Sequence, residues 1–134
     1  MTKGKWTDKV QASDFDRMVV RGLSAIGPFL EGEVIVRTPV KWGRLRGSYT
    51  YAIKKEQDEI RPDKNGIRWP EDKIDKPTDK YTLYVGTNCN YGPHVEYGTR
   101  NMAAQPHARP ALDRNRKRCG EIFQKEIKKV LRGQ

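Results

Sequence analysis

The sequence predicts an α+β domain with a helix at each end and short strands between them. Three observations support this prediction. Apolar residues recur at helical spacing over residues 15–30, and they do so again over about 110–131. Two segments between them, 48–53 and 81–86, alternate in polarity and have high β propensity. The chain has 134 residues, so we expect a single domain over 1–134.

The N-terminal helix is predicted to follow a flexible polar arm over residues 1–12. Its apolar residues fall on one face at roughly 100° per residue. They are Phe15, Met18, Val19, Leu23, Ile26, Phe29 and Leu30. Pro28 lacks a backbone donor, so a kink or break is expected near it. Val34 and the two residues after it leave the apolar face, so the chain there is either helical or already extended.

A loop is predicted over residues 38–47, because this stretch contains a proline and two glycines that interrupt regular structure. The loop carries Arg44 and Arg46 beside Trp42, so it has chemistry of its own. Residues 48–53 are predicted to form a strand directly after it.

Residues 54–80 are rich in charge but balanced, with eight Lys or Arg and eight Asp or Glu. Three prolines interrupt this stretch, and Asn65-Gly66 suits a two-residue hairpin turn. We therefore expect either a long hairpin or a mobile loop, and a loop of this length in a small domain tends to be functional.

Residues 91–112 are dense in residues with a definite backbone preference. Pro93 suits the first position of a helix, and Gly98 suits the residue just past its end. Pro106 and Pro110 each favour an extended residue before them, and Pro110 is well placed to open a helix. We predict a strand, one helical turn, an extended crossing and then the long helix.

The C-terminal helix is predicted from about Pro110 to Leu131 and is amphipathic. Its apolar face is formed by Leu112, Cys119, Ile122, Phe123, Ile127 and Val130. Its basic face points within about 60° of the opposite direction. This basic face consists of Arg114, Lys117, Arg118, Lys125, Lys128 and Lys129. Arg116 falls on the apolar side, where it would have to extend its charge toward water.

The formal net charge is +10, from 27 Lys and Arg against 17 Asp and Glu, and it is distributed unevenly. Between Thr99 and Gln134, ten basic residues face three acidic ones, which places +7 of the charge in this part. Such a field suits an anionic partner, either nucleic acid or an acidic protein surface. The simpler interpretation is a solvated helix face.

Composition narrows the class of protein. Hydrophobic residues are 35% and charged residues 33%, which favours a small core with much surface over a deep active site. No apolar run reaches transmembrane length and no signal peptide is visible, so we expect a protein made in the cytoplasm with no membrane partner. Two cysteines imply no disulfide framework.

The sequence gives little support for metal binding or for catalysis. Cys89, His94, His107 and Cys119 are candidate ligands, but their spacing fits no usual zinc pattern, so no metal and no cofactor is expected. The sequence contains no P-loop and no Gly-rich dinucleotide motif. His94 and Glu96 form one candidate acid–base pair, although two surface groups on one helical turn are the simpler interpretation. We predict no enzymatic activity.

Three stretches together resemble a known family. Thr38-Pro-Val-Lys-Trp-Gly-Arg-Leu-Arg46 resembles a Thr-Pro-Val-x-Thr-Gly-x-Leu-Arg motif. Pro93-His-Val-Glu-Tyr-Gly-Thr99 is similar to Pro-x-Val-Glu-x-Gly-Thr, and Gln105-Pro-His-Ala-Arg-Pro-Ala111 is similar to a closing Pro-x-x-Arg-Pro-Ala. These motifs belong to the head–tail joining, or tail-completion, proteins of long-tailed double-stranded-DNA bacteriophages, also called neck or minor capsid proteins. The resemblance covers about residues 13–131, and it departs from the family at Trp42, where Thr is usual.

The resemblance implies an antiparallel sheet packed by an N-terminal and a C-terminal helix, with the charged segment 54–80 as an insertion. It implies no catalysis and no cofactor. It also implies a virion protein, assembled in the bacterial cytoplasm, that forms a ring at the head–tail junction. Its partners would be copies of itself, the head connector or stopper, and the tail tube or tail terminator.

We assign candidate roles on this basis. The residues predicted to contact a neighbouring subunit or ring are Trp42, Arg44, Arg46, Glu96, Tyr97 and Arg109. The residues predicted to shape the backbone are Thr38, Pro39, Gly43, Leu45, Pro93, Gly98, Pro106 and Pro110. Loop arginines set against the acids of 56–79 could supply the unlike patches that a ring requires. The basic face could instead point into the lumen, where packaged DNA passes.

Two alternatives from other classes remain open. A small basic nucleic-acid-binding protein would bind short duplexes as a monomer, with a steep dependence on salt. A hydrolase using His94 and Glu96 would show a pH-dependent activity that is lost in His94→Ala. No sequence motif supports either one.

Overall fold

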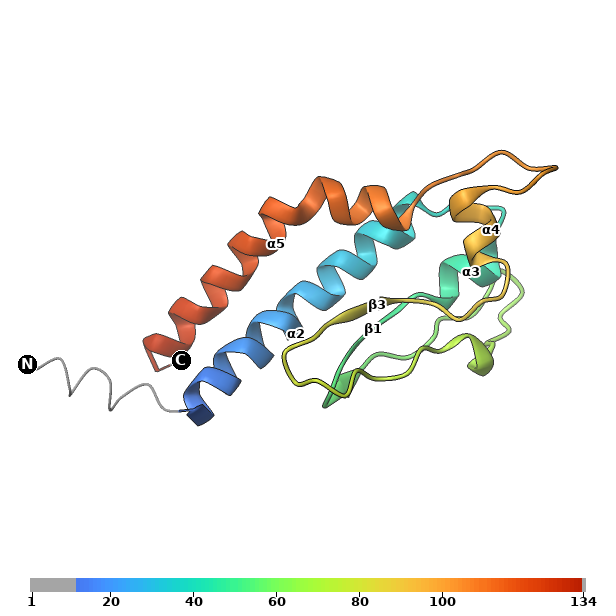
Figure 1. The fold of residues 1–134 in the computed structure, drawn as a ribbon. Coiled ribbons are helices and arrows are strands. Elements are labelled where there is room, and N and C mark those ends of the chain that lie inside the picture. The colour runs from blue at the N-terminus through green and yellow to red at the C-terminus, as the bar shows by residue number, and fades with distance from the viewer. Residues whose placement is uncertain (1–11, 134) are drawn as a thin grey trace, which may run out of the picture.

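The computed structural model describes residues 12–133, which form the α+β fold that the sequence predicts (Figure 1). The elements are α2 (Ala12–Arg37), α3 (Gly43–Ser48), β1 (Thr50–Ile53), β2 (Glu56–Gln57), the 3₁₀ turn η1 (Pro70–Asp72), β3 (Tyr84–Gly86), α4 (Gly92–Tyr97) and α5 (Ala108–Leu131). Most of the predicted arm, residues 1–11, lies outside the described residues, and Ala12 already belongs to α2.

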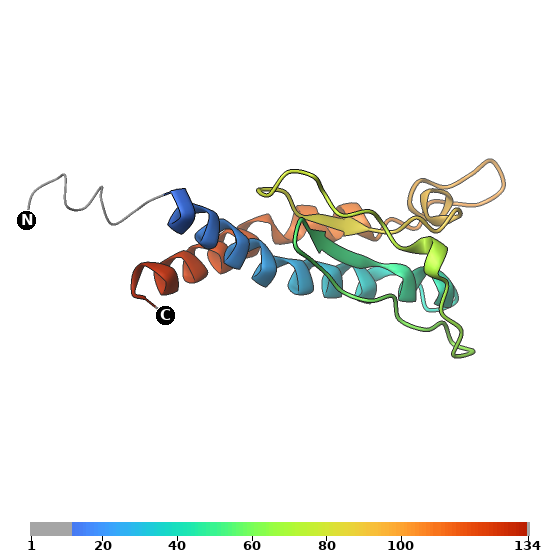
Figure 2. The same cartoon turned by 90° about the horizontal axis from the view of Figure 1, so that it is seen from below.

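Helix α2 forms the middle layer of the molecule. It packs against α5 on one side and against β1 and β3 on the other. Figures 1 and 2 show α2 and α5 side by side and antiparallel, with the sheet next to α2. Within residues 12–133, no helix combines the length and apolarity that a bilayer crossing needs.

Helix α2 runs through Pro28 without interruption, so the predicted break is absent. Proline removes one helical hydrogen bond, but Ile26, Leu30 and Val34 are buried on both sides of it, and their packing holds the helix together. Pro28 itself is exposed. Val34 is helical rather than extended.

Two glycines explain how α2 can pack closely against both α5 and the sheet. A Cβ on Gly22 would lie 2.2 Å from Cδ1 of Phe123 on α5, and a Cβ on Gly27 would lie 2.4 Å from Cδ2 of Tyr51 on β1. Each glycine therefore provides the room for an aromatic ring. The two glycines weaken the helix locally, but they allow both neighbours to approach closely.

The sheet has three antiparallel strands in the order β2-β1-β3. Thr50 pairs with Gly86 and Ala52 with Tyr84, and all four residues of β1 are buried. Both strands are shorter than predicted. The first begins at Thr50 because Gly43–Ser48, expected to be mostly loop, forms α3 instead.

Segment 54–80 does not form the long hairpin that we offered as one alternative: β2 (Glu56–Gln57) closes a short hairpin with β1, and the rest is irregular apart from η1. The turn at Asn65-Gly66 forms, with Gly66 at φ +80°, but no strand flanks it. The segment contacts the sheet along its course, since Gln57 Nε2 donates a hydrogen bond to the Ile74 carbonyl at 2.8 Å.

A buried hydrophobic cluster lies at one end of the molecule, where α2, α3, α4 and the start of α5 meet. Its buried members are Val34, Leu45, Tyr49, Cys89, Val95 and Ala111. Most of these residues lie in or next to the three motif stretches, so the motifs and the core occupy the same region.

Candidate functional site

The three motif stretches meet at one end, which we call the motif end (residues 38–47 and 91–112). Trp42 Nε1 donates a hydrogen bond to Gln105 Oε1 at 3.3 Å, which joins the first stretch to the third. Glu96 joins the second stretch to the third, because its carboxylate accepts hydrogen bonds from the backbone that opens α5. Stretches that are up to about 70 residues apart in sequence thus form one structural unit.

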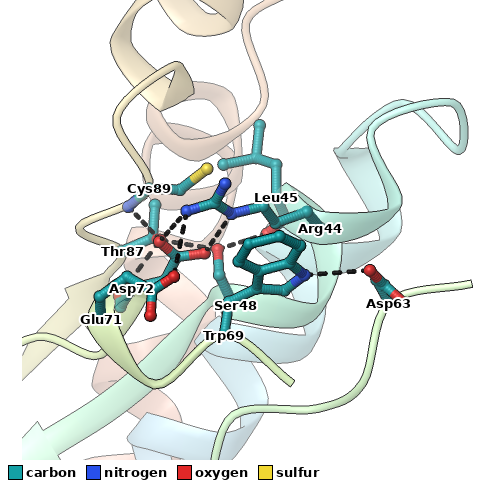
Figure 3. Close-up of polar contacts among 9 residues, drawn as sticks. All are labelled: Arg44, Leu45, Ser48, Asp63, Trp69, Glu71, Asp72, Thr87 and Cys89. Carbon is teal, nitrogen blue, oxygen red and sulfur yellow. Dashed lines mark hydrogen bonds and ion pairs between the residues drawn. The ribbon is translucent and has the colours of Figure 1, made fainter. Parts of the chain in front are cut away.

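Arg44 is engaged inside the subunit, as Figure 3 shows. Its Nε and Nη2 donate to the two carboxylate oxygens of Asp72 at 2.8 and 2.9 Å, and the Asp72 side chain is 1% exposed. The guanidinium lies 4.1 Å over the ring of Trp69. The hydrogen bonds to Asp72 raise the pKa of Arg44, so it stays a cation. Where we predicted a neighbouring subunit, Arg44 fastens the loop 54–80 to α3.

The polar network continues from Asp72 to the end of β3 (Figure 3). The Asp72 carbonyl accepts a hydrogen bond from the Asn88 N–H at 2.8 Å. Thr87 Oγ1 accepts from the Cys89 N–H at 2.9 Å, and it lies 2.6 Å from the Ser48 hydroxyl. The network therefore ties the loop to both α3 and the chain that enters α4.

Trp42 and Leu45 mainly pack the motif end. The Trp42 ring lies 5.4 Å from the Tyr91 ring and is half-buried. Leu45 is fully buried, and a Cβ on Gly92 would lie 3.3 Å from it. The unusual tryptophan at position 42 therefore has a packing role next to Tyr91.

Arg46 keeps part of its surface in solvent. Its Nε donates to the Ile35 carbonyl at 3.2 Å, and it lines a depression of about 300 Å³ with Arg61 and Lys64. Val40 also lines this depression and is 71% exposed. Val40 is not among the predicted site residues, because a lone valine in a loop carries no signal of exposure.

Glu96 caps α5 from outside that helix. Its Oε1 accepts hydrogen bonds from the N–H groups of His107 and Ala108 at 3.1 and 2.9 Å, and its Oε2 accepts from the Arg109 N–H at 3.3 Å. These donors belong to the helix start, where no helical acceptor exists, and Pro110 has no N–H. Burial alone would raise the pKa of Glu96, but these three donors and His107 outweigh it and lower the pKa. Glu96 is 6% exposed, so it stabilises its own subunit, although we predicted an intersubunit contact for it.

Tyr97 and Arg109 lie on the outside of the same region. Tyr97 is 63% exposed, and the Arg109 guanidinium lies 5.7 Å from the centre of its ring. The two side chains come from different motif stretches, and both can reach a partner.

The backbone-shaping residues behave largely as predicted. Thr38 Oγ1 donates to the Val34 carbonyl at 2.8 Å where α2 ends. Pro93 and Pro110 lie in the first turns of α4 and α5. Gly98 has φ +81°, and a Cβ there would lie 2.8 Å from a backbone nitrogen, so only glycine fits. The others lie where the chain turns or crosses, except that Gly43 opens α3; they are Pro39, Gly43 and Pro106.

The basic face of α5 is exposed, with Lys129 half-buried and paired to Glu126 at 3.0 Å. Arg116 keeps its charge in water, since its side chain is 67% exposed and pairs with Asp113 at 3.1 Å. The neighbouring Leu112, on the predicted apolar face, is itself 40% exposed.

The candidate metal ligands do not converge. Within residues 12–133, no group of three His, Cys, Asp or Glu side chains could hold a metal ion. Cys89 is buried in the core, and the buried His107 ring hydrogen-bonds to the Tyr49 hydroxyl through Nε2. His94 is exposed while the Glu96 carboxylate points to α5, so the geometry lends no support to an acid–base pair.

Most acids of segment 54–80 are engaged within the subunit. Glu56 accepts a hydrogen bond from Ser24 Oγ at 2.9 Å, and Asp63 accepts one from Trp69 Nε1 at 3.0 Å. Asp72 accepts the two hydrogen bonds from Arg44 described above. These acids therefore serve the fold, which weakens our expectation that they form the acidic half of a ring contact.

A cleft beside β3 was not predicted. It has a volume of about 610 Å³ and lies between α2, β3 and the start of α5, with Leu30, Val34, Val85 and Leu112 among its lining residues. No sequence signal marks it, because the cleft depends on which strand forms the edge of the sheet.

Comparison with protein-family models, with curated proteins and with solved structures finds no match for this chain. The resemblance therefore rests on the three motifs alone.

Proposed function

We propose that this protein is a non-enzymatic structural subunit of the head–tail junction in a long-tailed phage virion or prophage. Its copies form or complete a ring through which DNA passes, between the head connector or stopper and the tail tube or terminator. One observation carries the proposal. The three stretches that resemble this family pack on one another at the motif end, where Trp42 contacts Gln105 and Glu96 caps α5. Chance matches to three short motifs would not be expected to interlock.

A ring requires two different patches on each subunit that fit head to tail. The motif end offers exposed candidates in two places, Tyr97 with Arg109 and Val40 with Arg46. Arg44 and Glu96 support these places from within the subunit.

The basic face of α5 suits a surface that lies near DNA. Its exposed lysines and arginines supply the non-specific electrostatic attraction that a duplex experiences. A lumen lined in this way would hold DNA without reading its sequence.

Light scattering after size-exclusion chromatography tests the proposal, with protein concentration varied from dilute to concentrated. We expect a ring-sized species that grows with concentration. The double variant Tyr97→Ala/Arg109→Ala should shift it toward monomer. Leu131→Ala is the matched control, because Leu131 is 59% exposed but lies at the C-terminal end of α5, at the other end of the molecule from the motif end (Figure 1). A ring that forms equally well in both variants would remove Tyr97 and Arg109 from the contact.

A small basic nucleic-acid-binding protein is the second candidate, favoured by the charge of +10 and the exposed basic face. It predicts tight binding of a short duplex by the monomer, with an affinity that falls steeply as salt rises. Reversal of Lys117 and Lys125 to Glu should reduce that salt dependence. Tight binding by the monomer, without any ring, would favour this candidate over the junction role.

A further inference from the structure

A depression of about 300 Å³ lies where the loop 54–80 passes over α3. Gly47 allows the loop to pass closely, because a Cβ there would lie 2.8 Å from the Arg61 carbonyl oxygen. The Arg61 N–H donates a hydrogen bond to the Gly47 carbonyl at 2.9 Å, which holds the loop at this distance. Ile35, near the end of α2, lines the same depression. The walls of the depression therefore come from segments that the fold holds in place.

Two cations at the depression carry charge that the subunit does not use. Arg46 donates only through Nε, to the Ile35 carbonyl at 3.2 Å, and its two Nη groups have no acceptor among the described residues. Lys64 is exposed, and no acid in the described part of the chain pairs with its ammonium group. Arg61 differs, because its Nη2 lies 3.5 Å from the Asp58 carboxylate. The depression therefore offers Arg46 and Lys64 to a ligand.

Asp63 is the only acid among the described residues that line the depression. Its Oδ1 accepts hydrogen bonds from the Asn65 and Ile67 N–H groups at 2.8 and 2.9 Å, and its Oδ2 accepts one from Trp69 Nε1 at 3.0 Å. Both oxygens are thus engaged within their own turn of the loop. The two unpaired cations outnumber this acid, so the depression keeps an excess of positive charge and suits an anionic ligand.

The depression also has an apolar part. Ile35, Val40 and Pro62 line it, and Val40 is 71% exposed. A ligand that covers this part gains free energy by removing apolar surface from water. A nucleic-acid duplex presents phosphates, which supply no apolar partner for Val40. A fitting ligand combines a carboxylate with a neighbouring apolar side chain, which is the chemistry of a protein segment.

We propose that this depression binds an acidic segment of a different protein, in which a carboxylate pairs with Arg46 and Lys64 and a neighbouring apolar side chain covers Val40. A second copy of the chain is a poor source of that carboxylate. The net charge is +10, and most acids of segment 54–80 are engaged within the subunit. The inference rests on the proposed function only for the place of the partner, a neighbouring protein of the head–tail junction.

Titration of the full chain with a blocked peptide, followed through its amide NMR signals, tests the proposal. The probe is acetyl-Ser-Glu-Val-Ser-amide, and acetyl-Ser-Gln-Val-Ser-amide is its uncharged control of equal size. We expect the glutamate peptide to shift the amide signals of Val40, Arg46 and Lys64 with a dissociation constant of about 5 mM. The glutamine peptide should bind about fivefold more weakly, as expected for the loss of two surface ion pairs. Equal affinity of the two peptides, or no shift at these amides, overturns the proposal.

Variants of the protein test the two parts of the site separately. Lys64→Gln removes a cation that forms no ion pair within the described subunit, so it should weaken peptide binding about twofold and leave the fold intact. Val40→Ala should also weaken binding about twofold, which a purely electrostatic attraction would not produce. Lys117→Gln is the matched control, because Lys117 is exposed on α5 and does not line the depression. An unchanged affinity in Lys64→Gln or in Val40→Ala, or an equal loss in Lys117→Gln, overturns the proposal.

The outcomes separate the inference from the proposed function. Specific peptide binding by a protein that forms no ring supports the inference and counts against unaided ring formation. A ring without specific peptide binding overturns the inference and leaves the proposed function standing. A short duplex that shifts the Val40 and Lys64 amides more than the Lys117 amide would assign the depression to nucleic acid and overturn the inference as well.

Discussion

Arg44 and Arg61 each reach a buried carboxylate, but they do so with different geometry. Arg44 makes two hydrogen bonds to Asp72, at 2.8 and 2.9 Å. Arg61 reaches Glu31 through Nη2 alone, without the paired hydrogen-bond geometry that joins Arg44 to Asp72. Both carboxylate side chains are 1% exposed, so the two acids are equally buried, but they differ in their donors and in the Asp58 carboxylate near Glu31.

The number of hydrogen-bond donors decides whether a buried acid stabilises the fold. Burial raises the pKa of Glu31 to about 8, the nearby Asp58 adds to the rise, and Arg61 opposes it only in part. Glu31 therefore keeps its proton at neutral pH. Glu96, which has three backbone donors, has a lowered pKa in spite of its burial. A buried acid stabilises this protein where donors meet it and opposes ionisation where they do not.

The largest expected effect is at Glu96, the acid with the most donors. Glu96→Ala leaves three N–H groups at the start of α5 without an acceptor in a buried place. We expect the free energy of unfolding to fall by about 3 kcal/mol, since each unsatisfied buried donor is costly. Urea denaturation at pH 7 measures this loss.

The pH dependence of the Glu96→Gln variant tests whether the charge of Glu96 matters for capping α5. The folded-state pKa of Glu96 is lowered, so its stabilising contribution is complete above the unfolded pKa, about 4.3, and is lost as pH falls through the folded value. The stability gap between the original protein and Glu96→Gln should therefore shrink from pH 6 to pH 3. A gap that stays constant across this range would show that charge is irrelevant to the cap.

Asp72→Ala should have the second largest effect. It removes the acceptor of Arg44, and we expect a loss of about 2 kcal/mol, because hydrogen bonds to charged groups are among the stronger ones. The loss should be local first, with faster amide exchange at Asn88, whose N–H donates to the Asp72 carbonyl. Arg44→Lys is the companion variant. It keeps the charge but lacks the two-pronged geometry, so it should reproduce part of the loss.

Glu31→Gln should have the opposite sign. The folded-state pKa of Glu31 is raised, so the folded protein binds a proton that the unfolded chain releases, and stability falls as pH rises from about 4.5 to about 8. Glutamine removes this slope. We expect a gain of about 1 to 2 kcal/mol at pH 8 and little change near pH 4.5, measured by thermal unfolding at both pH values. Destabilisation at pH 8 would mean that the Arg61 contact outweighs the cost of burial.

The sequence was sufficient for the elements that depend on local chemistry. Pro93 and Gly98 delimit α4 as predicted, and the period of apolar residues located both long helices. Prediction from the sequence failed where tertiary packing competes with local backbone preference. Helix α2 passes through Pro28 because its flanks are buried, and α3 forms in a stretch whose glycines suggested a loop.

The sequence indicated that the motif stretches belong together but not what their side chains contact. They lie at one end of the molecule, where Arg44 and Glu96, predicted to face partners, form hydrogen bonds within the subunit. No local pattern reveals that Asp72 lies opposite Arg44, because the two residues are brought together only by the path of loop 54–80. The cleft at β3 was hidden for the same reason.

The smallest effect is expected for Ser24→Ala. This variant tests, close to Glu31, whether hydrogen-bond donors determine how a buried acid affects stability. Ser24 lies seven residues before Glu31 on α2 and donates to Glu56, whose carboxylate also accepts from the Tyr51 hydroxyl. Glu56 is thus a satisfied acid in the same layer as an unsatisfied one. Because the Tyr51 donor remains, Ser24→Ala should cost only about 0.5 to 1 kcal/mol, and the cost should be equal at pH 6 and pH 8. A gain in stability, as expected for Glu31→Gln, would show that acids in this layer act by position alone and that donors do not decide their effect.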